Sequence, residues 1–296
     1  MKPRPPGHSA TVIGWLPVPL LPLAALALYN VVQPWILMWC LAISIYAGLK
    51  WLTWWKARSN IPHKAWRSVA YLFAWPGMDA ESFLDETRRP ASPGLQRWLV
   101  AGAETIIGIV LIWVIARALP PGHPLLRGWV GMLGLIFLLH FGIFQLAALF
   151  WQSCGVDAPA IMSAPLRSRS LSEFWGRRWN LGFRQLAHEL VFSPLHGSVG
   201  VGTAGLLVFV FSGLIHDLVI SVPARGGYGL PTAYFILQGI GVAVERSRFG
   251  RRYALRGGIS GRLFAALLTL GPVFWLFHPP FVLRVIIPFM KAIHAR

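Results

Sequence analysis

A histidine within an apolar run and a polar tract that ends in asparagine are the residues of this sequence best suited to chemistry. His216 lies in the run LLVFVFSGLIHDLVI, from Leu206 to Ile220, which is long enough with its flanks to form a helix across a bilayer. An ionisable side chain inside such a helix costs free energy and therefore indicates function. Asn180 lies 36 residues upstream (216 − 180) and closes the tract SLSEFWGRRWN, which begins at Ser170.

The His216 imidazole is suited to general-base catalysis, because histidine is the side chain most readily used to accept a proton near neutral pH. Asp217 follows directly but points about 100° away around a helix, so it need not be a partner of His216. A histidine in this position can also serve only to join neighbouring helices by hydrogen bonds. Burial alone leaves both interpretations open.

The ends of the polar tract carry hydrogen-bonding groups with different expected roles. Ser170 or Ser172 is suited to cap a helix, and the early Glu173 complements the positive end of that helix. Asn180 has an amide that can donate to a developing oxyanion or orient a substrate hydroxyl.

The middle of the tract predicts substrate contacts. Arg177 and Arg178 can pair with the phosphates of an incoming donor, as guanidinium groups do well. Trp175 and Trp179 are expected beside them at the substrate. The alternative is an interfacial helix whose two tryptophans anchor at the lipid head groups, and the two roles are compatible.

The composition predicts a polytopic membrane protein that is entirely α-helical. Apolar residues make up 55% of the chain and charged residues 12%, against about 25% charged residues in soluble domains. The net charge of +17 lies in short loops between apolar runs, so membrane topology explains it and nucleic acid is excluded as a partner. We expect contact with membrane lipids and a single integral domain over residues 1–296. Nothing in the sequence indicates an oligomeric state.

Seven or eight spans are expected, together with interfacial or re-entrant helices. Asp79 to Arg97 has mixed charges and is predicted to be a solvated loop, and Ala65 to Trp75 is too short to span. The first span contains three prolines, which are expected to bend or break it. The predicted spans run from Thr11 to Tyr29, Trp35 to Leu52, Trp98 to Leu119, Gly128 to Trp151, Ser198 to Ser221, Gly229 to Glu245 and Leu263 to Phe277, with a possible eighth from Phe281 to Met290.

The distribution of basic residues predicts the orientation. With the N-terminus in the cytoplasm, 21 of the 27 Lys and Arg fall on the cytoplasmic side, three outside and three in the last tail. The segment from Met1 to Pro6 is basic, and the following apolar run lacks a cleavage site for a signal peptide. We therefore expect a multi-pass protein of a bacterial inner membrane. Asn180 then begins on the cytoplasmic side, whereas His216 lies about 18 residues, or ~27 Å of helix, beyond Ser198. A tilted helix, a water-filled cavity or a re-entrant Asn180 segment must therefore bring the two residues together.

The motifs in this order resemble the wax-synthase branch of the membrane-bound O-acyltransferase superfamily. The resemblance rests on LRSRSLSEFWGRRWN, then VFSPL, then the FSGLIHDL span, with further likeness in FILQGIGVAVER and FHPPFV. It covers about residues 140–288. By position, His216 matches the catalytic histidine of that family and Asn180 its second polar residue.

The resemblance implies helices around an internal chamber and transfer of an acyl group from acyl-CoA, as cosubstrate, to an alcohol hydroxyl. It implies no metal, no further cofactor and no covalent acyl-enzyme. The alternatives are a short-chain (acetyl-CoA) transferase acting on a small-molecule or sugar hydroxyl, a membrane transporter and a non-catalytic scaffold. Among the other polar residues, Glu104 and His140 are expected to join helices or to line the acceptor tunnel, and Glu245 is expected to pair with the adjacent Arg246 at the interface.

Overall fold

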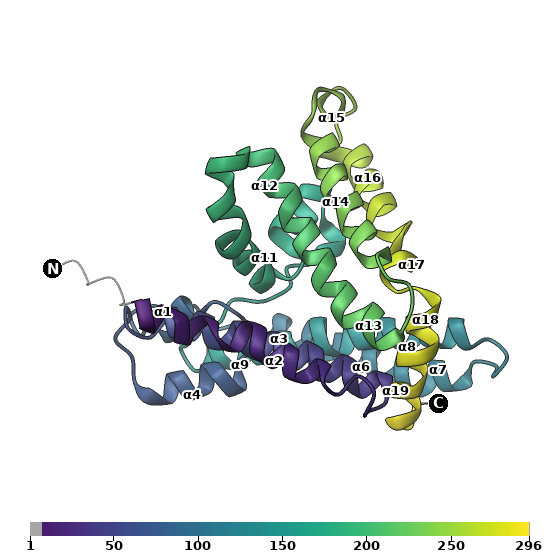
Figure 1. Cartoon of the computed structure of the whole chain (residues 1–296), viewed down its shortest axis with the longest axis horizontal. Helices are drawn as coiled ribbons and strands as arrows, with labels where there is room; N and C mark the ends of the chain where they lie inside the picture. Colours follow the sequence, from purple (N-terminus) through teal and green to yellow (C-terminus); the bar gives the residue numbers. More distant parts are fainter. Residues whose placement is uncertain (1–7, 296) are drawn as a thin grey trace. The chain divides into compact units, whose positions relative to one another are not determined.

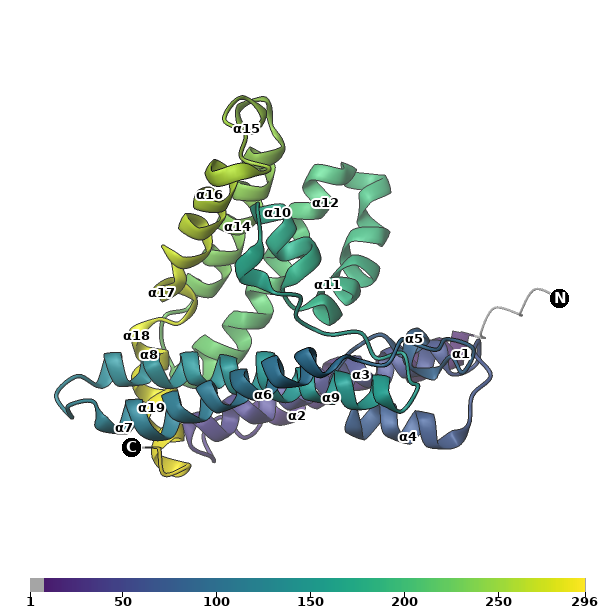
Figure 2. The same cartoon turned by 180° about the vertical axis from the view of Figure 1, so that it is seen from behind.

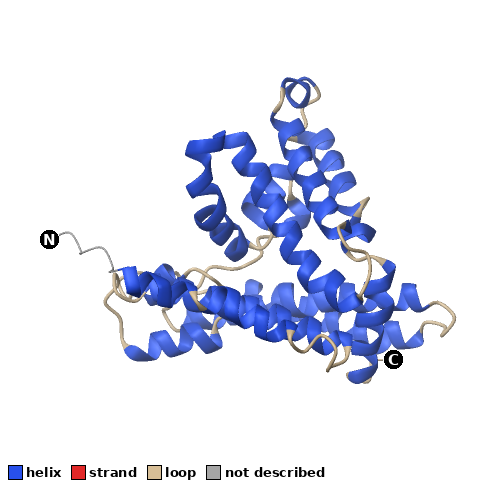
Figure 3. Ribbon diagram, viewed as in Figure 1, coloured by secondary structure: helices blue, strands red, loops and turns tan. Residues whose placement is uncertain are grey.

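The computed structural model describes residues 8–295, with side chains from Val12 onward, and all regular elements in that range are helices (Figure 3). The basic segment from Met1 to Pro6 lies outside the described residues. The chain divides into two compact units. Unit 1 comprises residues up to 115 together with 130–160, and unit 2 comprises 116–129 and 161–296. The division into two units reflects which residues lie close together. It does not test the prediction of one integral domain, which stays a prediction.

Unit 1 is built from long apolar helices joined by short connections (Figure 1). Helix α8 begins in unit 2 and ends in unit 1. Its elements are α1 His8–Trp15, α2 Pro17–Leu26, α3 Pro34–Ala57, α4 Ala65–Ala74, α5 Ala80–Leu84, α6 Leu95–Val110, the π-helical η1 Leu111–Ile115, α8 Pro124–Leu135, the π-helical η2 Ile136–Ile143 and α9 Phe144–Ser153.

Glycines allow the helices of unit 1 to pack closely. A Cβ at Gly48 of α3 would lie 2.8 Å from the carbonyl oxygen of Pro17, and one at Gly108 of α6 would lie 2.5 Å from the amide nitrogen of Leu138 in η2. Small residues of this kind let helix backbones approach where apolar lipid provides no hydrophobic driving force between helices. The α2–α3 and α6–η2 pairs are therefore held by shape complementarity.

One expectation for unit 1 was wrong in detail. The predicted solvated loop contains α5, whose Phe83 is fully buried and stacks with Trp75 at 6.1 Å between ring centroids. Lys50 and Arg67 are 2% and 6% exposed. Both are packed side chains, because main-chain carbonyls and aromatic rings provide them with polar and cation–π contacts.

Unit 2 contains both motifs of interest, and Figure 2 shows its elements from behind. Its elements are α7 Ala116–Ala118, the 3₁₀ turn η3 Pro165–Arg167, α10 Leu171–Glu173, the π-helical η4 Phe174–Arg178, α11 Leu181–Ala187, the π-helical η5 His188–Phe192, α12 Ser193–His216, the π-helical η6 Asp217–Ser221, α13 Val222–Ala224, α14 Leu230–Arg246, α15 Arg248–Arg252, α16 Gly258–Leu270, α17 Val273–Leu276, α18 Pro279–Phe281, the π-helical η7 Val282–Ile286 and α19 Ile287–Ala292.

The predicted span from Ser198 to Ser221 forms the second helix of a helical hairpin. Helical structure starts at Leu181 and is interrupted at Gly200, whose φ of 81° and ψ of 159° lie outside the helical region. Beyond Gly200 the chain turns back (Figure 1), and η5 packs against α12. The backbone at Gly200 favours glycine, since a side chain is strained at this φ.

The prediction of a polytopic, all-α membrane protein is confirmed. Five helical stretches of the described chain are long and apolar enough to cross a membrane, namely 34–57, 95–118, 124–153, 181–224 and 258–276. The first predicted span is divided into α1 and α2 on either side of Leu16, in agreement with the expected effect of its prolines. The predicted span from Gly229 to Glu245 is α14, which has 17 residues.

Candidate functional site

The polar tract folds as a short capped helix that continues as a π-helix. The Oγ of Ser170 accepts a hydrogen bond from the amide of Glu173 at 3.1 Å, which confirms Ser170 as the cap of α10. In return, Glu173 Oε2 accepts from the Arg169 amide at 2.8 Å. These two reciprocal bonds satisfy main-chain donors at the start of the helix.

Glu173 also holds the far end of the tract. Its carboxylate accepts hydrogen bonds from Nε and Nη2 of Arg178, at 2.7 and 2.6 Å. The hydrogen bond from the Arg169 amide, followed by the bond and charge of Arg178, holds the pKa of the Glu173 carboxyl below its ordinary value. Glu173 therefore links the start of the tract to Arg178 near its end.

The two arginines expected at phosphates are placed differently. Arg178 is occupied by Glu173 and by the carbonyls of Ser163 and Ala164, at 3.1 and 3.3 Å. Arg177 is exposed and makes no ion pair with the described residues. Arg177 is thus available to an incoming anion, whereas Arg178 first shapes the tract. Phosphate binding by either remains a prediction.

Trp175 connects the tract to α12 and α14. Its ring lies 5.5 Å from Phe235 and 5.9 Å from Phe209, and its Nε1 donates to Gln238 Oε1 at 3.3 Å. Such edge and tilted contacts favour aromatic packing beyond the area that they bury. Trp179, next to Asn180, stacks on Phe174 with 5.5 Å between the ring centroids.

Asn180 has a structural role at its own position. It adopts the left-handed conformation, with φ of 41°, and its Oδ1 accepts from the Phe183 amide at 3.2 Å as the N-cap of α11. Asparagine tolerates this conformation better than most residues because its short amide bonds locally. With Oδ1 engaged, the Nδ2 group is the part of Asn180 that can donate to another molecule.

The geometry of His216 defines which ring nitrogen can act as a base. Nδ1 lies 2.7 Å from the carbonyl oxygen of Ser212, one turn earlier in α12. A carbonyl only accepts, so Nδ1 carries the proton and Nε2 holds the lone pair. The His216 ring also lies 4.4 Å from the Phe235 ring. The main chain of α12 and the ring of Phe235 therefore set both tautomer and orientation.

Asp217 fastens the next helix and is not the partner of His216. Its Oδ1 accepts from Ser221 Oγ at 2.8 Å and from the Gly229 amide at 2.9 Å. Its Oδ2 accepts from the Thr232 amide at 3.0 Å and from the Thr232 hydroxyl. A carboxylate at this place satisfies free amides at the start of α14 and complements its positive end. This confirms that the two neighbouring side chains point to different groups.

One face of α14 carries residues whose contacts with the tract were not expected from the sequence. Gln238, Gly241 and Glu245 follow helical spacing and face the tract. Gln238 bonds Trp175, a Cβ at Gly241 would lie 2.7 Å from a methyl of Leu171, and Glu245 Oε2 accepts from the Ser172 amide at 3.0 Å. Polar Gln238 and Glu245 at positions i and i+7 of an apolar helix were the available signal.

The expected interface pair of Glu245 with Arg246 was wrong. Glu245 is fully buried, makes no ion pair in the described part of the chain and leaves Oε1 without a hydrogen-bond partner. Successive residues of a helix point about 100° apart, so Glu245 turns inward to the tract. Its carboxylate instead supports the start of α10.

The two legs on either side of Gly200 have similar lengths. About 18 residues, or ~27 Å of helix, lead from Leu181 to Val199, and about 15 residues, or ~23 Å, lead back from Val201 to His216. Trp175 then reaches His216 through the shared neighbour Phe235. The three solutions expected for the separation of Asn180 and His216 across the membrane stay predictions.

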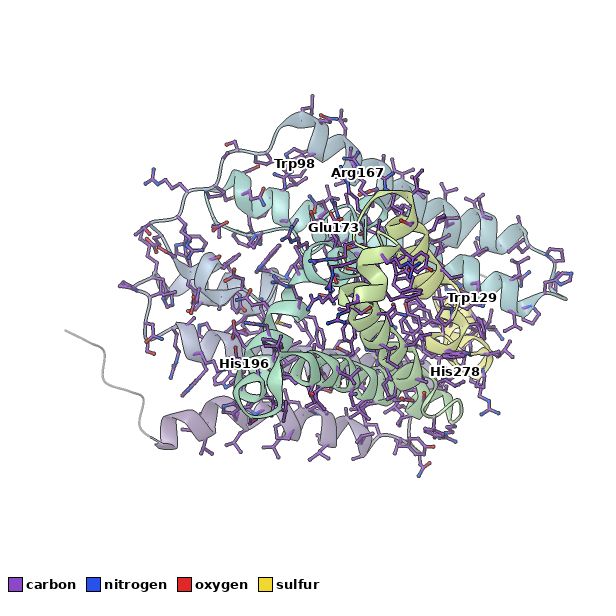
Figure 4. The ribbon with its side chains drawn as sticks, turned by 90° about the horizontal axis from the view of Figure 1, so that it is seen from above. Trp98, Trp129, Arg167, Glu173, His196 and His278 are labelled. Carbon is purple, nitrogen blue, oxygen red and sulfur yellow. The ribbon has the colours of Figure 1, made fainter. Side chains whose placement is uncertain are left out.

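Other histidines and cavities lie elsewhere. Figure 4 labels His196, which lies in the first turn of α12, and His278, which caps α18. His278 is fully buried, where its Nε2 contacts Ser221 Oγ at 3.2 Å and its Nδ1 accepts from the Phe281 amide. Glu104 and His140 lie in unit 1, whereas His216 lies in unit 2. One cavity lies in unit 1, and a second surrounds Gly257 near α15.

The segment that contains the polar tract and His216 is similar to a known protein family. Residues 158–237 match the Membrane bound O-acyl transferase family. That segment includes the whole tract, Asn180, His216 and Phe235, and it ends one residue before Gln238.

Relatives with curated names come from plants. The chain is 30% identical over 143 residues to a long-chain-alcohol O-fatty-acyltransferase of Simmondsia chinensis, covering 43% of this chain and 40% of that protein. It is 31% identical over 155 residues to probable long-chain-alcohol O-fatty-acyltransferase 9 of Arabidopsis thaliana, covering 46% and 44%. Acyl-CoA–sterol O-acyltransferase 1 of the same plant is 30% identical over 134 residues, covering 40% and 37%. The alignments thus span less than half of these relatives.

Proposed function

We propose that the chain transfers an acyl group from acyl-CoA to the hydroxyl of an alcohol, because its residues 158–237 match the Membrane bound O-acyl transferase family. The observation that carries the proposal is the fixed tautomer of His216, which leaves Nε2 unprotonated at the aromatic group formed with Phe235 and Trp175. The names of the plant relatives favour a long-chain alcohol as acceptor and a fatty acyl chain as donor.

The proposed reaction is one displacement at the thioester carbonyl. His216 Nε2 takes the proton of the alcohol hydroxyl while its oxygen bonds to the carbonyl carbon. The negative charge that collects on the carbonyl oxygen receives a hydrogen bond from Asn180 Nδ2. The carbon–sulfur bond then breaks, and the CoA thiolate leaves with the proton held by His216. The products are an ester and free CoA.

Substrate contacts are proposed along the tract. The exposed Arg177 is suited to phosphates of CoA, with Arg178 in support, and the rings of Trp175 and Trp179 offer apolar surface beside them. We propose that seven or eight spans enclose an internal chamber, with the N-terminus and the tract on the cytoplasmic side of a bacterial inner membrane. The positive charge of the loops supports this orientation.

The test is release of free CoA from acyl-CoA donors of graded chain length by purified, detergent-solubilised protein, with and without a panel of alcohols. His216→Ala should lower acceptor-dependent release on the order of 10²–10⁴-fold. His196→Ala is a matched control, because His196 lies in the same helix, also bonds a carbonyl through Nδ1, and is exposed. It should retain wild-type activity.

Either of two results would contradict the proposal. Equal release by wild type and His216→Ala would remove His216 as the base. The absence of release from folded wild-type protein across all donors and acceptors would favour transport or a scaffold role. The best donor distinguishes a fatty acyl transferase from one that uses acetyl-CoA.

A further inference from the structure

A cavity in unit 1 has a positively charged wall that the proposed acyl transfer does not use. Its volume is about 400 Å³, and its wall includes Arg67, Glu86, Arg89, Gln152 and Cys154. From this cavity we infer a binding site for a phosphate group, carried either by a membrane lipid or by a soluble molecule. The inference does not depend on acyl transfer, because these residues lie outside the family segment.

Arg67 is a buried cation that forms no ion pair with a carboxylate of the described residues. It is 6% exposed, and its two hydrogen bonds run from Nη1 to the carbonyl oxygens of Phe83 and Asp85, at 2.8 and 3.2 Å. Its Nε is buried without a partner. Burial of an unpaired charge is costly, so an anion in the adjacent cavity would stabilise the guanidinium.

The nearest carboxylates are already engaged. The side chain of Asp85 accepts from Thr87 and pairs with Arg88 at 3.3 Å, and these contacts hold the pKa of the Asp85 carboxyl below its ordinary value. Glu86 accepts from the Lys64 amide at 2.9 Å and lies 3.9 Å from Lys64 Nζ. Neither acid therefore cancels the charge of Arg67.

A second arginine at the cavity is available. Arg89 is exposed and has no ion pair or hydrogen bond within the described part of the chain. Gln152, also in the wall, is held through Oε1 by Arg97 at 3.0 Å and donates to the Ala158 carbonyl at 2.8 Å. The wall contains two arginines and one glutamate, which is already paired, so its net charge is positive. Guanidinium groups match phosphate oxygens in both charge and hydrogen-bond geometry.

Helix α4 places this cavity next to an apolar surface. Trp66, Val69 and Phe73 follow one face of α4 and are 47%, 59% and 84% exposed, whereas Arg67 and Tyr71 face inward. A short helix with such an apolar stripe is suited to lie in a membrane interface, where lipid phosphates are found. A lipid head group and a soluble phosphate compound both supply this chemical group.

The experiment uses Cys154 as a reporter, because its thiol is exposed at the cavity wall. The rate of its alkylation by N-ethylmaleimide is measured by peptide mass spectrometry, which separates it from Cys40. The soluble probe is adenosine 3′,5′-bisphosphate, with adenosine as the phosphate-free control. The lipid probe is phosphatidic acid in mixed micelles, with diacylglycerol as its phosphate-free control.

Phosphate-bearing probes should slow alkylation several-fold, and the phosphate-free controls should not. Protection should be lost in Arg89→Ala and Arg67→Gln and retained in Arg58→Ala, whose exposed guanidinium stacks on Trp55 outside the cavity. Protection only by phosphatidic acid identifies a lipid site, and protection only by the bisphosphate identifies a soluble ligand. The inference is overturned if no phosphate protects the folded protein, or if Arg89→Ala leaves protection unchanged. Arg89 is exposed, so that variant decides the test even where Arg67→Gln fails to fold.

Discussion

The imidazole of His216 lies 4.4 Å from the ring of Phe235, centroid to centroid, with 38° between the two planes. Phe235 also contacts Trp175 at 5.5 Å, so one side chain of α14 lies between the proposed base and the polar tract. The position of His216 depends on α14 as much as on its own helix.

Replacing Phe235 with leucine should lower kcat about 10-fold with little change in melting temperature. The substitution retains apolar bulk but removes the ring face that orients His216 and Trp175, and a displaced base is costly to catalysis. The measurement is acceptor-dependent CoA release together with a thermal melt. Phe249→Leu, at an exposed aromatic of α15, is the control and should keep wild-type kcat. An unchanged kcat in Phe235→Leu would show that the ring has no positioning role.

Replacing Glu245 with alanine should destabilise unit 2 by roughly 1–3 kcal/mol, because the amide of Ser172 loses its acceptor. The same change should lower kcat through displacement of Trp175, and Glu245→Gln, which retains an acceptor, should recover part of the loss. Melting temperature and kcat are measured side by side. Glu189→Ala is the control, since Glu189 is exposed and bonds only Gln185 in the described structure. Equal behaviour of the Glu245→Ala and Glu189→Ala variants would refute the support role.

Replacing Gly200 with alanine should cost roughly 1–3 kcal/mol, because a side chain is strained at φ of 81° and ψ of 159°. Gly202→Ala is a matched control two residues away in helical structure, where a Cβ meets nothing within 4 Å. It should be neutral or stabilising by up to about 1 kcal/mol. Thermal melts in detergent compare the two variants. If both variants melt at the same temperature, the reversal does not require glycine at position 200.

The link between Glu173 and Arg178 should make stability depend on pH in the acid range. Because the folded-state pKa of Glu173 is lowered, its contribution is present above the ordinary value of 4.5 and is lost as pH falls through the folded-state value. The melting temperature of Glu173→Gln should therefore lie below that of wild type at pH 7, and the gap should close below pH 4.5. A gap that stays constant between pH 7 and the acid range would contradict this assignment.

The sequence alone determined the chemical character of this protein. The content of apolar residues, the scarcity of charges and the positive loops indicated a helical membrane protein, because the transfer of such residues between water and lipid depends mainly on residue type. The pairing of the SLSEFWGRRWN tract with a histidine in an apolar helix identified the region that matches the family. Local signals were also reliable, as the cap at Ser170 shows, because capping involves residues only a few positions apart.

Tertiary structure decided how those residues meet. The helical run that starts at Leu181 is interrupted at Gly200, and neither composition nor periodicity reveals that an apolar run of this length folds back. The inward turn of Glu245, the engagement of Asp217 with α14 and the burial of Arg67 likewise join residues far apart in the chain. Such contacts depend on which helix faces are brought together. Side-chain type determines what a residue can bond, and packing determines which partner is within reach.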